Sequence, residues 1–205
     1  MNYYQKWRHF FVADAVLLVI MVPWDIIFTN LGVWGFNPLY NLGIHVFLLP
    51  LEEWLFFIIV PFACVFIYEV VIYFDNTNSF QKLGMPITLG VLVLCLILLF
   101  LGFGQMYTTV TMGLLIPLLL FHQVILKGNY LGRFYIAFAF MLIPFFIVNG
   151  ILTGSFIAEE VVWYNMTETF GYRLFTIPLE DVFYCLFMML FIITIYEWRK
   201  QKAIG

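Results

Sequence analysis

Two short segments place pairs of acidic residues in an otherwise apolar part of the chain. PLEEWLFFI begins at Pro50, and PLEDVFYCL begins at Pro178, 128 residues later. Crowded carboxyls in an apolar setting favour a neutral, protonated form for at least one of them, because burial and mutual repulsion both oppose charge. A protonated carboxyl beside an ionised one can serve as general acid and general base. The chemistry indicated is proton transfer, and the candidate catalytic residues are Glu52, Glu53, Glu180 and Asp181.

An aromatic residue follows the first acid of each pair by four positions, Phe56 after Glu52 and Tyr184 after Glu180. Residues four apart share one face of a helix, so each acid is expected beside an aromatic ring. Aromatic faces stabilise cations. These groups suit a lipid-soluble polyene that is protonated, closes a ring and loses a proton, without a redox cofactor.

A purely structural role for the first acids is the alternative. Carboxylates in the first turn of a helix interact favourably with the partial positive charge of its N-terminus, by about 0.3–1 kcal/mol. One segment alone would fit that role. Two copies, each with a second acid and an aromatic neighbour, favour a site, because a helix terminus requires neither of them.

The composition is that of a membrane protein. Of the 205 residues, 64% are hydrophobic and 10% are charged, and the mean hydropathy is +1.02, values far outside the range of soluble domains. Aromatic residues make up 21% of the chain, so aromatic cavity walls are expected. The three cysteines and three histidines are scattered, which predicts neither a disulfide framework nor a metal site. The net charge of −3 gives no indication of a nucleic-acid partner.

Six apolar runs are long enough to cross a hydrocarbon core of ~30 Å as helices. They predict an all-α membrane protein with six transmembrane helices, near residues 10–29, 50–74, 86–104, 107–126, 133–154 and 179–198. Three prolines stand where helices are expected to begin, at Pro50, Pro86 and Pro178. Four others fall inside the runs, at Pro23, Pro61, Pro117 and Pro144.

The basic residues predict the orientation. All except Arg173 fall on one side of a six-span arrangement, and cytoplasmic loops carry such an excess. We expect a multi-pass protein of the cell membrane with both termini in the cytoplasm. The loops 30–49 and 155–177 then lie outside, and both acidic pairs begin helices at that outer face.

The chain contains an internal repeat by this interpretation. Residues 43–69 align with 171–197 without a gap, and eight positions are identical, including the Pro-Leu-Glu segments and a Tyr-Glu pair. We predict two parallel repeats, residues 1–84 and 106–205, joined by a linking helix at 85–105. Upstream, Asp25 lies four residues before Thr29, as Asn149 lies four before Thr153.

Acids within apolar spans are expected to face inward, since each costs about 2.5–3.5 kcal/mol at the centre of a lipid-facing helix. Asp25 reaches the same outer level as the acidic pairs. The supporting or substrate-binding candidates are Asp25, Asn149, Trp24, Trp34, Phe56 and Tyr184.

The segments WDIIFT, GVWGFNP, PLEEWLFF and IPLEDVFY resemble the lycopene cyclase domain family, the two-part, non-flavin carotenoid cyclases of membranes, here in fused form. The resemblance covers nearly the whole chain. It implies closure of the acyclic ends of lycopene to β-rings, giving β-carotene by way of γ-carotene, with no cofactor. It also implies that the two acidic pairs are catalytic, and it leaves open which acid donates the proton and which group accepts it.

One departure concerns the first half. Members of this family usually begin with a further helix, so we expect either a start upstream of Met1 or a first half of two helices. The sequence leaves open the ring type, the substrate length and whether one or both ends are closed. A homo-oligomer is compatible with the sequence. The alternative function is a small proton- or cation-coupled transporter or a lipid-binding module, although no pair of Gly-rich broken helices is present.

Overall fold

The structure is a computed structural model, and it describes residues 3–202. Within that range, six helices are long and apolar enough to cross a membrane, which confirms the predicted all-α membrane class. A short 3-10 helix, η1 (Tyr3–Lys6), precedes the first of them, and a π-helical turn, η3 (His122–Leu126), extends the fourth. The helices are α1 (Trp7–Leu31), α2 (Leu51–Phe74), α3 (Gln81–Leu101), α4 (Met106–Phe121), α5 (Leu131–Leu152) and α6 (Leu179–Lys202).

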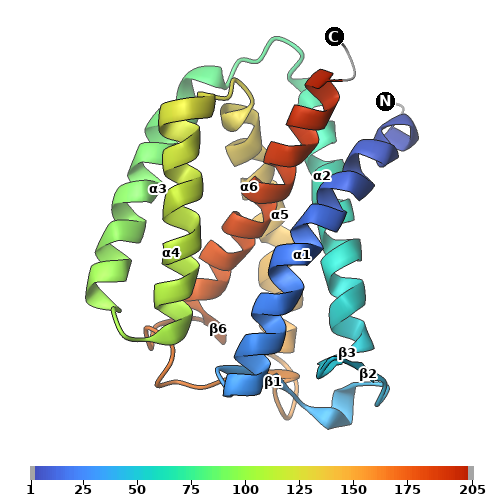
Figure 1. The fold of residues 1–205 in the computed structure, drawn as a ribbon, viewed down its shortest axis with the longest axis vertical. Helices are drawn as coiled ribbons and strands as arrows, with labels where there is room; N and C mark the ends of the chain where they lie inside the picture. Colours follow the sequence, from blue (N-terminus) through green and yellow to red (C-terminus); the bar gives the residue numbers. More distant parts are fainter. Residues whose placement is uncertain (1–2, 203–205) are drawn as a thin grey trace.

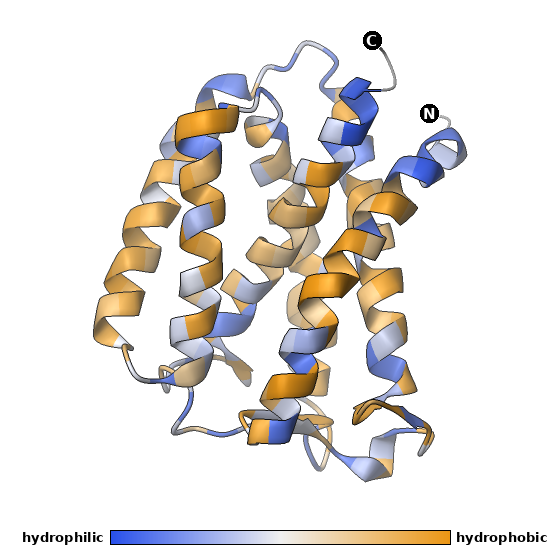
Figure 2. Ribbon diagram, viewed as in Figure 1, coloured by the Kyte–Doolittle hydropathy of each residue, from blue (hydrophilic) through white to orange (hydrophobic). Residues whose placement is uncertain are grey.

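The helices form one bundle in which both ends of the chain lie at the same end (Figure 1). Helix α6 packs against α1 and α4, α2 packs against α5, and α3 packs against α4 and α5. Of the six spans, α6 is the most buried. Figure 2 shows apolar residues along the lengths of the helices and polar residues gathered at their ends, as expected of a bundle surrounded by lipid.

The prediction for one proline was wrong. Pro86 lies inside α3, which begins five residues earlier at Gln81. The apolar run begins at Pro86, but the helix starts in the preceding polar turn, where Asp75 accepts a hydrogen bond from the Ser79 amide. A proline in the second turn removes only one backbone hydrogen bond. Pro50 and Pro178 do immediately precede α2 and α6, and the other four prolines lie within helices as predicted.

Short strand pairs cover the end of the bundle opposite the termini, a feature that the sequence did not predict. The three antiparallel pairs join β1 (Trp34–Phe36) to β4 (Val162–Tyr164), β2 (His45–Val46) to β3 (Leu49–Pro50), and β5 (Arg173–Leu174) to β6 (Ile177–Pro178). The first pair links the two long loops. Their meeting could not be read from hydropathy, because it joins segments far apart in the chain.

The hairpins that lead into α2 and α6 are alike. Both pair their first residue with the proline that precedes the helix, and both have a Phe in the left-handed region, Phe47 at φ 50° and Phe175 at φ 61°. Both also begin after a left-handed glycine, Gly43 at φ 75° and Gly171 at φ 78°, a conformation that favours glycine. The two acidic pairs therefore start their helices after similar hairpins, although the turn of the first has a second left-handed residue, Leu48 at φ 72°.

At the opposite end, near the termini, α2 and α6 exchange hydrogen bonds. Tyr68 Oη donates to Glu197 Oε1 at 3.1 Å, and Tyr196 Oη donates to Glu69 Oε1 at 2.8 Å. Lys200 forms ion pairs with both carboxylates, at 2.8 and 2.9 Å. These contacts compensate the buried charges and fix α2 against α6 far from the acidic pairs.

Candidate active site

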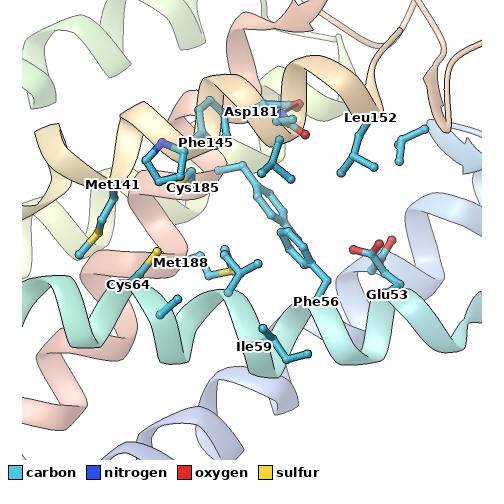
Figure 3. A pocket seen from close by; sticks show the side chains of 18 of the residues that line it. Glu53, Phe56, Ile59, Cys64, Met141, Phe145, Leu152, Asp181, Cys185 and Met188 are labelled. Carbon is cyan, nitrogen blue, oxygen red and sulfur yellow. Dashed lines mark hydrogen bonds between the residues drawn. The ribbon is translucent and has the colours of Figure 1, made fainter. Parts of the chain in front are cut away.

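A cavity of about 310 Å³ lies between α2, α5 and α6, with β1 and β4 lining one end. Most of its lining is apolar. Figure 3 shows Glu53 and Asp181 toward one end, and Cys64, Met141 and Met188 toward the other. The polar side chains of the lining come from α1, β1, α2, α4, α5, β4 and α6, and they are Asp25, Trp34, Glu53, Tyr107, Asn149, Tyr164, Asp181 and Tyr184.

Asp181 is buried, with 4% of its surface exposed, and it is held by three donors. Tyr107 Oη donates to Oδ1 at 2.7 Å, while Asn149 Nδ2 and Tyr164 Oη donate to Oδ2 at 2.7 and 3.0 Å. Hydrogen bonds from neutral donors favour the ionised form of a carboxyl. Burial, and then the charge of Asp181, hold the pKa of Tyr164 well above its usual range, so this tyrosine stays a proton-bearing donor.

The carboxyls of the first half have fewer donors. Trp34 Nε1 donates to Asp25 Oδ1 at 2.6 Å and Thr29 Oγ1 donates to the same atom at 3.4 Å. Asp25 Oδ2 is buried without a hydrogen-bond partner among residues 3–202. Glu53 receives no hydrogen bond from the described part of the chain, and it lines the same cavity as Asp25, so two negative charges there would repel one another. One proton held by this pair would remove the repulsion and leave a neutral acid in the cavity.

The structure separates the four predicted catalytic acids. Glu53 and Asp181 line the cavity, and Glu52 and Glu180 do not. Glu52 Oε1 accepts the Leu42 amide at 2.7 Å, and Glu180 Oε1 accepts the Phe170 amide. Successive residues of a helix point about 100° apart, so only the second acid of each pair faces the cavity while the first binds the loop before its helix.

The predicted aromatic residues are also divided. Trp34, Phe56 and Tyr184 line the cavity, whereas Trp24 lies behind it, with its ring centroid 4.9 Å from that of Tyr184. Both of the other supporting candidates, Asp25 and Asn149, lie in the lining. The walls near the carboxyls therefore present several aromatic rings, which can stabilise positive charge on a bound molecule.

Comparison with protein families identifies the family of this chain. A model of the lycopene cyclase family matches residues 2–71 and 104–199, which is most of the chain. The chain belongs to the lycopene cyclase family. Comparisons with curated proteins and with solved structures found no match.

Membership of the lycopene cyclase family identifies an enzyme of the cyclase type, with a carotenoid as its substrate and a lipid environment. The cavity described above is the place in this cyclase where such chemistry could occur. Its three carboxyls come from both matched stretches, Asp25 and Glu53 from the first and Asp181 from the second.

Two polar residues of the cyclase cavity were not predicted from the sequence, Tyr107 and Tyr164. Tyr107 lies in the first turn of α4, which has no counterpart in the first repeat of the predicted division, and Tyr164 lies in a long loop. A tyrosine near a helix end is typical of membrane interfaces, so neither position gave a distinct signal. Their role depends on tertiary contacts with Asp181.

No group of three or more His, Cys, Asp or Glu side chains that could hold a metal ion was found among residues 3–202. The cavity's polar groups are carboxyls, phenols, an amide and an indole. In the cyclase, these groups can donate, accept and orient protons.

Proposed function

We propose that the chain is a lycopene β-cyclase, an isomerase of the intramolecular lyase type, that closes the acyclic ends of lycopene to β-rings by proton transfer. One observation supports this most strongly. A single aromatic-walled cavity contains three carboxyls with unlike surroundings, Glu53 and Asp25 as a pair of acids and Asp181 beside three neutral donors. Environments that separate two carboxyls in this way assign them to acid and base roles.

The proposed reaction adds one proton and removes one. A carboxylic acid protonates the terminal double bond of the acyclic end and leaves a tertiary carbocation. The next double bond attacks this cation, which closes a six-membered ring and moves the charge to a ring carbon. A base then removes a proton from the adjacent ring carbon to form the β-ring double bond. Composition is unchanged and no electrons are exchanged, so the product is an isomer.

We assign the acid to Glu53 and the base to Asp181. We take one of the two carboxyls of the first half to be protonated, because both line the same cavity and two charges there would repel one another. That proton is the one donated to the polyene. Asp181, whose ionised form is favoured by its three donors, faces the cation and accepts the ring proton. The faces of Trp34, Phe56 and Tyr184 stabilise the charge between these steps.

The proposal includes a place in the cell. We propose the cell membrane as the location, with both termini in the cytoplasm, on the basis of the distribution of Lys and Arg. The carboxyl end of the cavity then lies toward the outer face. A carotenoid dissolved in the bilayer reaches this depth without crossing water.

The test is expression in a lycopene-accumulating host, followed by pigment chromatography. The wild-type chain should form cyclic carotenoids, and Glu53→Gln and Asp181→Asn should each lower conversion by about 10²–10⁴-fold, the usual contribution of general acid–base catalysis. Glu52→Gln is the matched control, because its carboxyl lies next in sequence but binds a loop. Unchanged lycopene with well-expressed wild-type protein would reject the function. Activity of Glu53→Gln equal to that of Glu52→Gln would reject the site.

A further inference from the structure

The cavity is open to the side of the bundle. Four lining residues are also exposed on the outer surface, Ile59 and Ala63 on α2, and Pro144 and Val148 on α5. Ile59 has 58% of its surface exposed and Val148 has 51%. In each helix the two residues are four apart and share one face. The seam between α2 and α5 is therefore a gap in the cavity wall, and Figure 3 shows the pocket between these helices.

This seam faces the hydrocarbon core. Helix α2 has no charged residue between Glu53 and Glu69, and α5 has none after Arg133. The cavity lining extends along α2 from Glu53 to Ile67, roughly 21 Å at about 1.5 Å per residue. Its carboxyls lie at one end only. An apolar chain in the bilayer can thus contact the gap directly, while its tip reaches the acids.

The corresponding seam between α1 and α6 is closed. In the predicted repeat, Trp24 corresponds to Val148 and Phe187 corresponds to Ile59. Trp24 has only 6% of its surface exposed, and its ring centroid lies 6.1 Å from that of Phe187. Large aromatic side chains fill this seam, whereas two aliphatic side chains leave the other open. The opening is therefore a specific difference between two otherwise similar helix pairs.

We propose that the seam between α2 and α5 is a lateral portal, through which one acyclic end of a polyene enters from the bilayer while the remainder stays in lipid. This rests on the proposed function. A cavity of about 310 Å³ is at the small end of ligand sites, which measure about 300–1,000 Å³, so it holds an end group and not a whole carotenoid. The enzyme then accepts any polyene with one acyclic end, whatever the far end carries. Each closure is a separate binding event, and the monocyclic product leaves between them.

Val148→Trp tests the portal, because it places at the open seam the residue that closes the other one. The protein is reconstituted in liposomes containing lycopene, and initial rates are measured. Val148→Trp and Ala63→Phe should each lower the rate by about tenfold or more, corresponding to ~1.4 kcal/mol. Ile147→Trp is the matched control, because Ile147 is 60% exposed on α5 but does not line the cavity. Its rate should stay within about twofold of wild type.

A second measurement separates the portal from the chemistry. The amount of lycopene that co-purifies with Glu53→Gln measures binding without turnover. Adding Val148→Trp to this variant should reduce the bound lycopene by the same factor as Val148→Trp alone reduces the initial rate. If the wild type forms no ring but Val148→Trp still removes the pigment, the proposed function fails and the portal stands. If the wild type forms rings and both portal variants match Ile147→Trp, the portal is rejected. Should Val148→Trp not fold, Ala63→Phe and Ile59→Phe decide the same question from α2.

The product sequence tests the entrance of one end at a time. With lycopene in excess, a monocyclic product should accumulate before the bicyclic one. A polyene already closed at one end should react at a rate similar to that of lycopene. A bicyclic product that forms with no monocyclic species at any time would overturn the inference.

Discussion

The carboxyl that α2 brings to the cavity and the one that α6 brings occupy equivalent positions in the predicted repeat but have unlike neighbours. Glu53 faces Asp25, a second acid, whereas Asp181 faces Asn149, an amide, at the position that corresponds to Asp25. Asp181 also accepts from Tyr107 on α4. Replacing one acid by an amide changes what the partner carboxyl can do. In the proposed reaction the first half holds the proton to be donated, and the second half holds the charge that accepts one.

The opposite end of the bundle provides the contrast. There the two halves are reciprocal, because Tyr68 donates to Glu197 and Tyr196 donates to Glu69. In each case a tyrosine of one half donates a hydrogen bond to a glutamate of the other. The halves are thus alike where they hold the bundle together and unlike where a proton must be given at one point and removed at another.

The largest expected effect is the loss of ring formation when Glu53 or Asp181 is replaced. The same variants test which of the two is the acid and which is the base. In D₂O, both Glu53→Gln and Asp181→Asn should lose about 10²–10⁴-fold in ring formation. Asp181→Asn keeps the acid, so it should still protonate the polyene reversibly and return lycopene that carries deuterium. Glu53→Gln should return unlabelled lycopene. Mass spectrometry of the recovered lycopene makes the measurement.

Glu52→Gln in the same D₂O experiment shows how much labelling accompanies normal turnover. Label in the lycopene recovered from Glu53→Gln, with none from Asp181→Asn, would exchange the two roles. The two halves would still have different roles, but Asp181 would be the acid and Glu53 the base.

The next effect comes from the acid that distinguishes the first half. Asp25→Asn makes this position resemble Asn149 of the second half and removes the repulsion that favours a proton on the pair. We expect a loss of turnover of about tenfold to 100-fold, which lies at or below the lower end of the range for general acid–base catalysis. Asp25→Glu, which keeps the second acid, should retain more activity than Asp25→Asn. Wild-type turnover by Asp25→Asn, measured per amount of folded protein, would remove Asp25 from the mechanism.

A smaller effect is expected from the donors to Asp181. Tyr107→Phe and Tyr164→Phe each remove one hydrogen bond to a carboxylate, worth about 1.5–3 kcal/mol. Each should lower turnover by about tenfold, the lower limit of the loss expected for Asp25→Asn. Neither should lower it further in an Asp181→Asn background, because the tyrosines act through this carboxylate. A further loss in that background would give the tyrosines a role of their own.

Hydropathy was sufficient for the bundle, because a membrane span needs about 20 apolar residues whatever its neighbours are. It could not show where α3 starts, since Gln81 and the turn before it depend on the Asp75 side chain. The sequence did place acids at the right helix ends. It could not distinguish Glu53 from Glu52, because the rotation of the first turn of α2 depends on the hairpin that precedes it. The approach of Tyr164 depends on pairing between two distant loops, and no local pattern encodes it.

The smallest expected effect is on stability, at Asp75, which lies outside the cavity. It tests whether the difference between Glu53 and Asp181 arises from proton transfer or from folding. Asp75, between α2 and α3, accepts the Ser79 amide at 2.8 Å and Arg133 Nε at 3.2 Å. The hydrogen bond from Ser79, with the Arg133 guanidinium, holds the pKa of Asp75 below its usual range. The ionised form therefore stabilises the fold at neutral pH. This contribution is lost as pH falls below the unfolded value of about 3.9 and through the lower folded one.

Asp75→Asn should accordingly lower the thermal unfolding temperature at neutral pH by a small amount, and the difference from wild type should shrink at about pH 3, below the unfolded pKa. Thermal scans of the detergent-solubilised protein at both pH values make the comparison. Asn76→Asp is the neighbouring control, because Asn76 is exposed. The ratio of Glu53→Gln to wild-type turnover should be unchanged when Asp75→Asn is added, because the loop contact touches neither carboxyl of the cavity. If that ratio moved with stability alone, the contrast between Glu53 and Asp181 would reflect folding and not proton transfer.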